Sequence, residues 1–286
     1  MVVGVDLARI RDTPAGNQLL ELAVDVAGGK ARIDDLTSRT GLHPLRQIRS
    51  AVLAFPEDAD RDGLFGAVIR GEGFDARRLI AYARDQVKKD GYDIEPSPRG
   101  ERTLWTETRE GITSGFFLDY QTFVIGSDVW ADKLADLADR VPGVSNAETD
   151  ADLVGLCRKA EASGALWAAA VVPAATRRRL RANPEFHAAA SVTRLRAGVA
   201  LGAGLDATVV AELSNAPDAV ALAGRVTASL REARRNPRIL MMGLGPYLDA
   251  VSVKAAGPSV VVAVKLTASQ AGDLAGRLRG RAAAIR

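Results

Sequence analysis

The stretch VSVKAAGPSVVVAVKL, residues 251–266, consists of two apolar runs separated by the short polar turn at 256–259. Runs rich in valine around a Gly-Pro turn are typical of an antiparallel hairpin. A helical pattern at residues 269–278 follows directly after the second run. The same order of hairpin and helix recurs along the chain, so the sequence predicts an α+β fold built on antiparallel hairpins.

The first half of the chain contains the same kinds of element. We predict strands at 2–7, 48–55, 64–71, 103–109, 115–120 and 122–126, and helices at 14–26, from 32 onward, at 75–82 and at 128–138. Asp75 is expected to cap its helix, because an aspartate directly before an amphipathic run accepts a hydrogen bond from the first turn.

The second half repeats this order. Its predicted strands are 166–172, 192–201, 208–213, 251–255 and 260–266, and its predicted helices are 174–181, 216–231 and 269–278. We therefore predict an internal duplication, with a first repeat at 1–142, a linker and short helix at 143–164, and a second repeat at 165–286. Helices are expected on one face of the sheet. The two repeats form either two separate sheets or one shared sheet.

Composition excludes several classes of protein. The chain has 286 residues, of which 47% are hydrophobic and 26% charged, as in ordinary globular domains. No apolar run approaches the roughly 18 residues of a membrane-spanning helix. One cysteine excludes an internal disulfide, and with two histidines it leaves too few nitrogen and sulfur ligands for a structural zinc site. We expect no metal and no cofactor.

Charge is nearly balanced, with 38 Lys and Arg against 35 Asp and Glu. This small excess and the scarcity of aromatic residues near the basic clusters make nucleic acid an unlikely partner. Two arginine clusters could bind an anionic lipid or another anionic surface, or could simply be the solvated faces of helices. They comprise Arg177, Arg178, Arg179, Arg181, Arg234 and Arg235.

No catalytic residue is predicted. His43, His187 and Cys157 lack the neighbours of a general base or an activated nucleophile. Cys157 is expected to be buried and inert.

The acidic residues do not form a predicted site either. Asp58, Asp60 and Asp62 have the spacing of the first half of a calcium-binding loop, but we favour the interpretation that they form a solvated hairpin tip. Most acidic residues fall at caps, hairpin tips and helix faces, so we expect no concave site with strongly shifted carboxylates.

A family resemblance rests on four segments. They are residues 2–7 with Pro14 after them, 50–55, 66–71 with Phe74 and Asp75, and 123–127. Together these segments resemble uncharacterised duplicated α+β envelope proteins of deltaproteobacterial type, often lipoproteins. The resemblance implies export behind a removed signal and implies no established activity.

These observations lead to three functional hypotheses. The first is a noncatalytic binding or scaffolding protein of the bacterial cell envelope, with an unknown protein or envelope component as its partner. The second is a carrier that holds an apolar or amphipathic ligand in the groove between the two repeats. The third, which we favour least, is a hydrolase that uses carboxylates. Because a strand begins directly after Met1, we expect an upstream segment that has been removed. A periplasmic or envelope location is implied by the family resemblance. A cytoplasmic location stays open.

Overall fold

The structure is a computed structural model that describes residues 1–26, 29–56, 64–109, 113–140, 151–183 and 186–284. Its first half contains β1 (Val2–Asp6), α1 (Leu7–Arg11), α2 (Pro14–Val26), α3 (Lys30–Thr40), α4 (Pro44–Gln47), β2 (Ile48–Ala54), β3 (Gly66–Gly71), α5 (Ala76–Lys88), β4 (Ile94–Arg99), β5 (Arg102–Glu107), β6 (Ser114–Asp119), β7 (Thr122–Gly126) and α6 (Asp128–Ala138).

The second half contains α7 (Ala151–Ala162), β8 (Leu166–Val171), α8 (Ala174–Ala182), the 3-10 turn η2 (His187–Ala189), β9 (Val192–Leu201), β10 (Leu205–Leu213), α9 (Ala216–Arg235), α10 (Pro237–Met241), α11 (Gly245–Asp249), β11 (Val251–Ala256), β12 (Ser259–Leu266) and α12 (Ala268–Ala284). The helix at 14–26 and the strands at 122–126 and 192–201 begin and end at the predicted residues.

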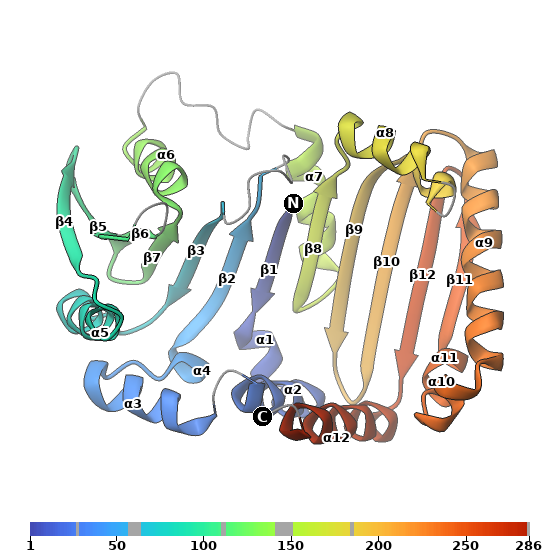
Figure 1. The fold of residues 1–286 in the computed structure, drawn as a ribbon, viewed down its shortest axis with the longest axis horizontal. Helices are drawn as coiled ribbons and strands as arrows, with labels where there is room; N and C mark the ends of the chain where they lie inside the picture. The colour runs from blue at the N-terminus through green and yellow to red at the C-terminus, as the bar shows by residue number, and fades with distance from the viewer. Residues whose placement is uncertain (27–28, 57–63, 110–112, 141–150, 184–185, 285–286) are drawn as a thin grey trace.

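Twelve strands of the described residues form one antiparallel sheet in the order β11-β12-β10-β9-β8-β1-β2-β3-β7-β6-β5-β4. Figure 1 shows this sheet face-on, with α8, α9, α12 and α5 around it. The predicted α+β class with antiparallel hairpins is confirmed. β4 was not predicted, because Pro96 and Pro98 argue against a strand. Prolines are tolerated there because β4 lies at the edge of the sheet and pairs only with β5, so the amides on its outer side need no partner in the sheet.

β1 and β8 join the two halves into a shared sheet. They pair antiparallel, with Gly4 opposite Trp167. A Cβ atom at Gly4 would lie 2.1 Å from Cε2 of Trp167, so the indole ring occupies the space that glycine leaves. Trp167 is buried together with Leu156 and Ala160 of α7. The question of one sheet or two, which the sequence left open, is therefore answered in favour of one.

The strand order is compatible with the predicted duplication. Within the first half the order is β1-β2-β3-β7-β6, and within the second half it is β8-β9-β10-β12-β11, with β5 and β4 added at the first half's outer edge. The repeats at 1–142 and 165–286 stay a prediction. Residues 143–150 of the predicted linker lie outside the described residues, and the short helix that follows them packs on β8.

Helices cover both faces of the sheet, whereas the sequence predicted one. We call the side that carries Val68, Phe116 and Val124 the α6 face, because these residues pack against α6. The side chains of Ile69, Phe117 and Phe123 point to the opposite side, which we call the α5 face. The prediction was wrong on this point because β7 has apolar residues at three successive positions, 123–125, so both of its faces can be buried.

The α5 face stays apolar across the centre of the sheet. In register, Leu53, Val3, Ala168, Ala197 and Val209 follow one another from β2 to β10. On the α6 face of β9 and β10, by contrast, Arg194 forms an ion pair with Glu212. α8 and α9 cover part of the α5 face in the second half. The α5 face is thus apolar from β2 to β10, and on the α6 face of β1, β2 and β8 the apolar residues belong to the Trp167 cluster beneath α7.

Candidate ligand-binding pocket

The floor of the candidate site is formed by strands of the first half. Alternation along a strand sends neighbouring side chains to opposite faces. Phe116 and Val124 therefore enter the core beneath α6, while Phe117 and Phe123 point to the α5 face. The last two rings touch, with centroids 4.8 Å apart.

α5 forms the roof of the site. Its first turn is capped by the carboxylate of Asp75, which accepts a hydrogen bond of 3.1 Å from the backbone amide of Arg78, as the sequence predicted. Leu79, Ala83 and Val87 lie on one side of the helix at spacings of four residues and face the sheet. None of the residues of α5 is fully buried, so the helix covers the strands without packing closely on them.

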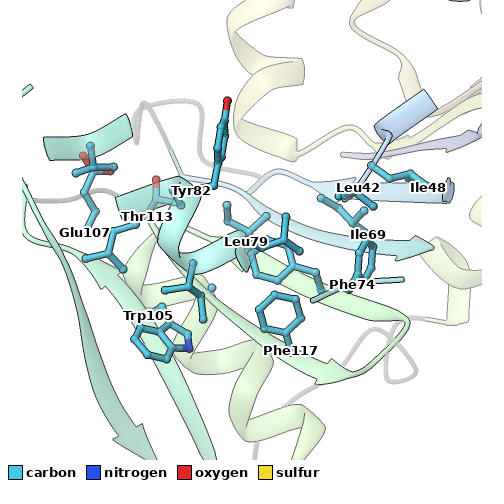
Figure 2. A pocket seen from close by; sticks show the side chains of 17 residues that line it. Leu42, Ile48, Ile69, Phe74, Leu79, Tyr82, Trp105, Glu107, Thr113 and Phe117 are labelled. Carbon is cyan, nitrogen blue, oxygen red and sulfur yellow. The ribbon is translucent and has the colours of Figure 1, made fainter. Parts of the chain in front are cut away.

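A cavity of about 380 Å³ lies between this roof and this floor. Figure 2 shows the side chains of its seventeen lining residues. Only four of them carry a polar side-chain atom, namely Tyr82, Trp105, Glu107 and Thr113. Its volume and its apolar wall with few polar groups are typical of a small-molecule site. We call this cavity the α5 pocket.

On the other side of the same strands, α6 packs closely on the sheet. Ala131 and Ala135 of α6 have no exposed surface and pack with Phe116, which is also 0% exposed. Small alanines let α6 approach the sheet closely. The first half of the sheet therefore carries a dense core on one face and a cavity on the other.

The polar groups of the α5 pocket gather toward one end. In Figure 2, Glu107 and Thr113 lie at one end and Leu42 and Ile48 at the other. The backbone amide of Glu107 donates a 3.0 Å hydrogen bond to the carbonyl of Thr113, and the Glu107 carboxylate lies 3.5 Å from Nε of Arg109. This arrangement gives the pocket a polar end and an apolar end.

Tyr82 lies on the roof, and its hydroxyl points away from the other labelled side chains (Figure 2). Burial, followed by a hydrogen bond to Asp35, raises the pKa of the Tyr82 hydroxyl. The guanidinium of Arg39 lies 5.0 Å from the centre of its ring. Tyr82 thus links α5 to α3 and keeps the roof in place beside the cavity.

The arginine clusters predicted to bind anions do not come together. Arg177, Arg178, Arg179 and Arg181 lie on α8, at the top of the strands in Figure 1, while Arg234 and Arg235 lie at the C-terminal end of α9, at the bottom. Arg234 donates to the carbonyl of Leu248 at 2.8 Å and pairs with Asp249 at 3.2 Å. The cluster on α9 is therefore tied into the fold at Arg234.

The cysteine, the two histidines and the acidic series considered as candidate site residues do not form a site among the described residues. Cys157 is half-buried against the Trp167 cluster rather than fully buried as predicted. His43 precedes α4 and is half-buried, and His187 is exposed in η2. Asp58, Asp60 and Asp62 lie outside the described residues. In the part of the chain that the structure describes, no three His, Cys, Asp or Glu side chains are placed to hold a metal ion.

Carboxylates with a displaced pKa among the described residues shift downward. The backbone amide of Ile94 lowers the pKa of Asp93, and the Tyr247 hydroxyl together with Arg277 lowers the pKa of Asp273. A carboxyl group that acts as a general acid near neutral pH needs a raised pKa, which is opposite to the shifts of Asp93 and Asp273.

Two other carboxylates, Asp6 and Glu161, line a hollow on the α6 face. There Asp6 caps α1 and forms an ion pair with Arg9.

Sequence reasoning placed a ligand groove between the repeats, whereas the α5 pocket lies wholly within residues 42–125. Of the three tryptophans, Trp167 is buried, Trp130 is half-buried and Trp105 lines the pocket. Phe74, Phe117 and Phe123 were not predicted as residues of a ligand site. Their only signal is the presence of large aromatic side chains beside an amphipathic helix.

No family model matches this chain, and no curated protein matches it. Among solved structures, that of crystal form I of TP0453 is similar, with 12% sequence identity, 98% of this chain and 92% of that chain covered, and a TM-score of 0.42. At this distance the likeness says nothing about a ligand. No helix among the described residues is long and apolar enough to cross a membrane.

Proposed function

We propose that this chain is a noncatalytic carrier that holds an apolar or amphipathic small molecule in the α5 pocket. The observation that carries the proposal is the cavity itself, which is about 380 Å³ in volume and lies beneath a helix with no fully buried residue. Side chains that line an apolar cavity lack dispersion contacts on the side that faces the cavity. A ligand that fills it restores those contacts and removes its own apolar surface from water.

The polar end of the pocket supports an amphipathic occupant. Glu107 and Thr113 can accept hydrogen bonds from a ligand's polar group, while Leu42, Ile48 and Phe74 surround its hydrocarbon part. A location in the cell envelope, as implied by the family resemblance, belongs to this proposal. A carrier of this kind is one form of the binding protein that the sequence favours.

The test is a fluorescence titration with N-phenyl-1-naphthylamine, a neutral apolar probe that brightens in apolar surroundings. The wild-type protein should bind it saturably. In Ala83→Trp an indole fills part of the pocket from the roof, so we expect affinity to fall at least about tenfold, which corresponds to about 1.4 kcal/mol.

Ala81→Trp is the matched control, because Ala81 lies two residues away on α5 and is exposed. Thermal unfolding followed by circular dichroism should show that both variants fold. Equal affinity in the two variants, or no binding by the wild type, would overturn the proposal.

A further inference from the structure

A second apolar cavity lies on the α5 face of the second half, beneath α8. It has a volume of about 580 Å³. Its floor is Ala170, Leu195 and Ala211, one residue from each of β8, β9 and β10. Its sides come from Leu180 of α8 and Leu222 of α9. We call it the α8 pocket, and it shares no lining residue with the α5 pocket.

The wall of the α8 pocket is almost entirely apolar. Thr176 supplies its one polar side chain among the described lining residues. Leu195 stays 37% exposed and Met1 49% exposed, so apolar surface lines the cavity without being sealed from water. A hydrocarbon chain that enters here gains contact on three strands and two helices.

Strong positive charge stands beside this apolar wall. α8 has the sequence AATRRRLRA, with four arginines and no carboxylate in nine residues. Thr176 and Leu180 face the cavity one turn apart. At 100° per residue, Arg177 flanks that side of the helix, while Arg178 points to the opposite side. The exposure of the two side chains agrees with these positions on the helix, because Arg177 is half-buried and Arg178 is exposed.

Arg177 does not line the cavity itself but directly follows the lining residue Thr176, which makes it the candidate to receive an anion at the edge of the cavity. Its Nε atom is buried and has no hydrogen-bond partner among the described residues. Burying a guanidinium donor without a partner is unfavourable, and a carboxylate supplies the acceptor that it lacks. The neighbouring arginines of α8 add an attractive field for the same sign of charge.

We propose that the α8 pocket binds one single-chain anionic amphiphile, a long-chain fatty acid, with the hydrocarbon chain in the cavity and the carboxylate on Arg177. The charge of α8 selects the anion, and the apolar wall selects the chain. This site goes beyond the carrier function proposed for the α5 pocket, both in its residues and in the class of its ligand.

The test is isothermal titration with sodium hexadecanoate below its micellar concentration, and with hexadecanol as the uncharged analogue. The titrations use Ala83→Trp, in which the α5 pocket is obstructed, as well as the wild type. We expect hexadecanoate to bind both proteins alike. Arg177→Gln should weaken hexadecanoate binding about tenfold and leave hexadecanol binding within about twofold.

Arg178→Gln is the matched control and should bind hexadecanoate like the wild type. Equal weakening in both variants, or binding only to anionic vesicles and not to monomeric hexadecanoate, would place the anion on the outer surface of α8 and overturn the proposal. Loss of hexadecanoate binding in Ala83→Trp would also overturn it, because the fatty acid would then occupy the α5 pocket. Failure of the neutral probe to bind the α5 pocket leaves this test unaffected.

Discussion

Replacing Phe116 by Ala is expected to lower the free energy of unfolding by about 3–5 kcal/mol, the usual cost of emptying a well-packed aromatic site. Phe116 has no exposed surface and packs with Ala131, Ala135 and Val124 on the α6 face. Because these neighbours are held by the sheet and by α6, they cannot collapse into the space left behind. Urea unfolding followed by circular dichroism measures the loss.

Phe117→Ala, one residue further along the same strand, is the matched comparison. Phe117 lines the α5 pocket and therefore already borders empty space. We expect its replacement to cost about 1–2 kcal/mol, because fewer contacts are lost. Equal costs at the two positions would show that the α5 face is packed as tightly as the α6 face.

Replacing Gly4 by Val is expected to lower the free energy of unfolding by about 2–3 kcal/mol. The first added carbon would already lie 2.1 Å from the ring of Trp167, so the indole must move out of the Leu156 cluster or the two central strands must separate. The same urea unfolding experiment measures this effect.

Two further variants test whether the clash with Trp167 causes the loss of stability in Gly4→Val. Trp167→Ala introduced together with Gly4→Val should recover part of the lost stability relative to the sum of the single changes, because the clash is removed. Gly155→Ala in α7 should raise stability by about 0.5–1 kcal/mol, since nothing lies within 4 Å of the added carbon. Additive effects of the two changes at positions 4 and 167 would contradict the assigned contact.

Local chemistry explains how much of the fold can be predicted. The cap at Asp75 and the hairpin turn at 256–259 depend on residues close together in the chain, and both were predicted correctly. The side of the sheet that each helix covers depends on tertiary packing. Strands such as β7 with apolar residues on both faces leave that choice open.

The pocket could not be predicted for a related reason. Leu79, Ala83 and Val87 show the pattern of any helix that packs on a core. Whether such a helix packs closely on the strands or leaves a cavity above them depends on tertiary packing, which no local sequence pattern encodes. The arginines of α8 were singled out by charge, but the cavity beside them also depends on β9, β10 and α9, which come later in the sequence.

The central claim is that a ligand lies in the α5 pocket, and tryptophan quenching by 11-bromoundecan-1-ol tests it most directly. Bromine quenches indole fluorescence on contact. Trp105 lines the pocket, whereas Trp130 packs against Gly66 on the α6 face and Trp167 belongs to the cluster beneath α7. The Trp130→Phe/Trp167→Phe variant therefore reports on the pocket alone, and Trp105→Phe reports on the other side of the sheet.

We expect saturable quenching in the variant that keeps only Trp105 and little in the variant that lacks it, with undecanol quenching neither. Quenching that is equal in the two variants, or confined to Trp105→Phe, would contradict a ligand site beneath α5.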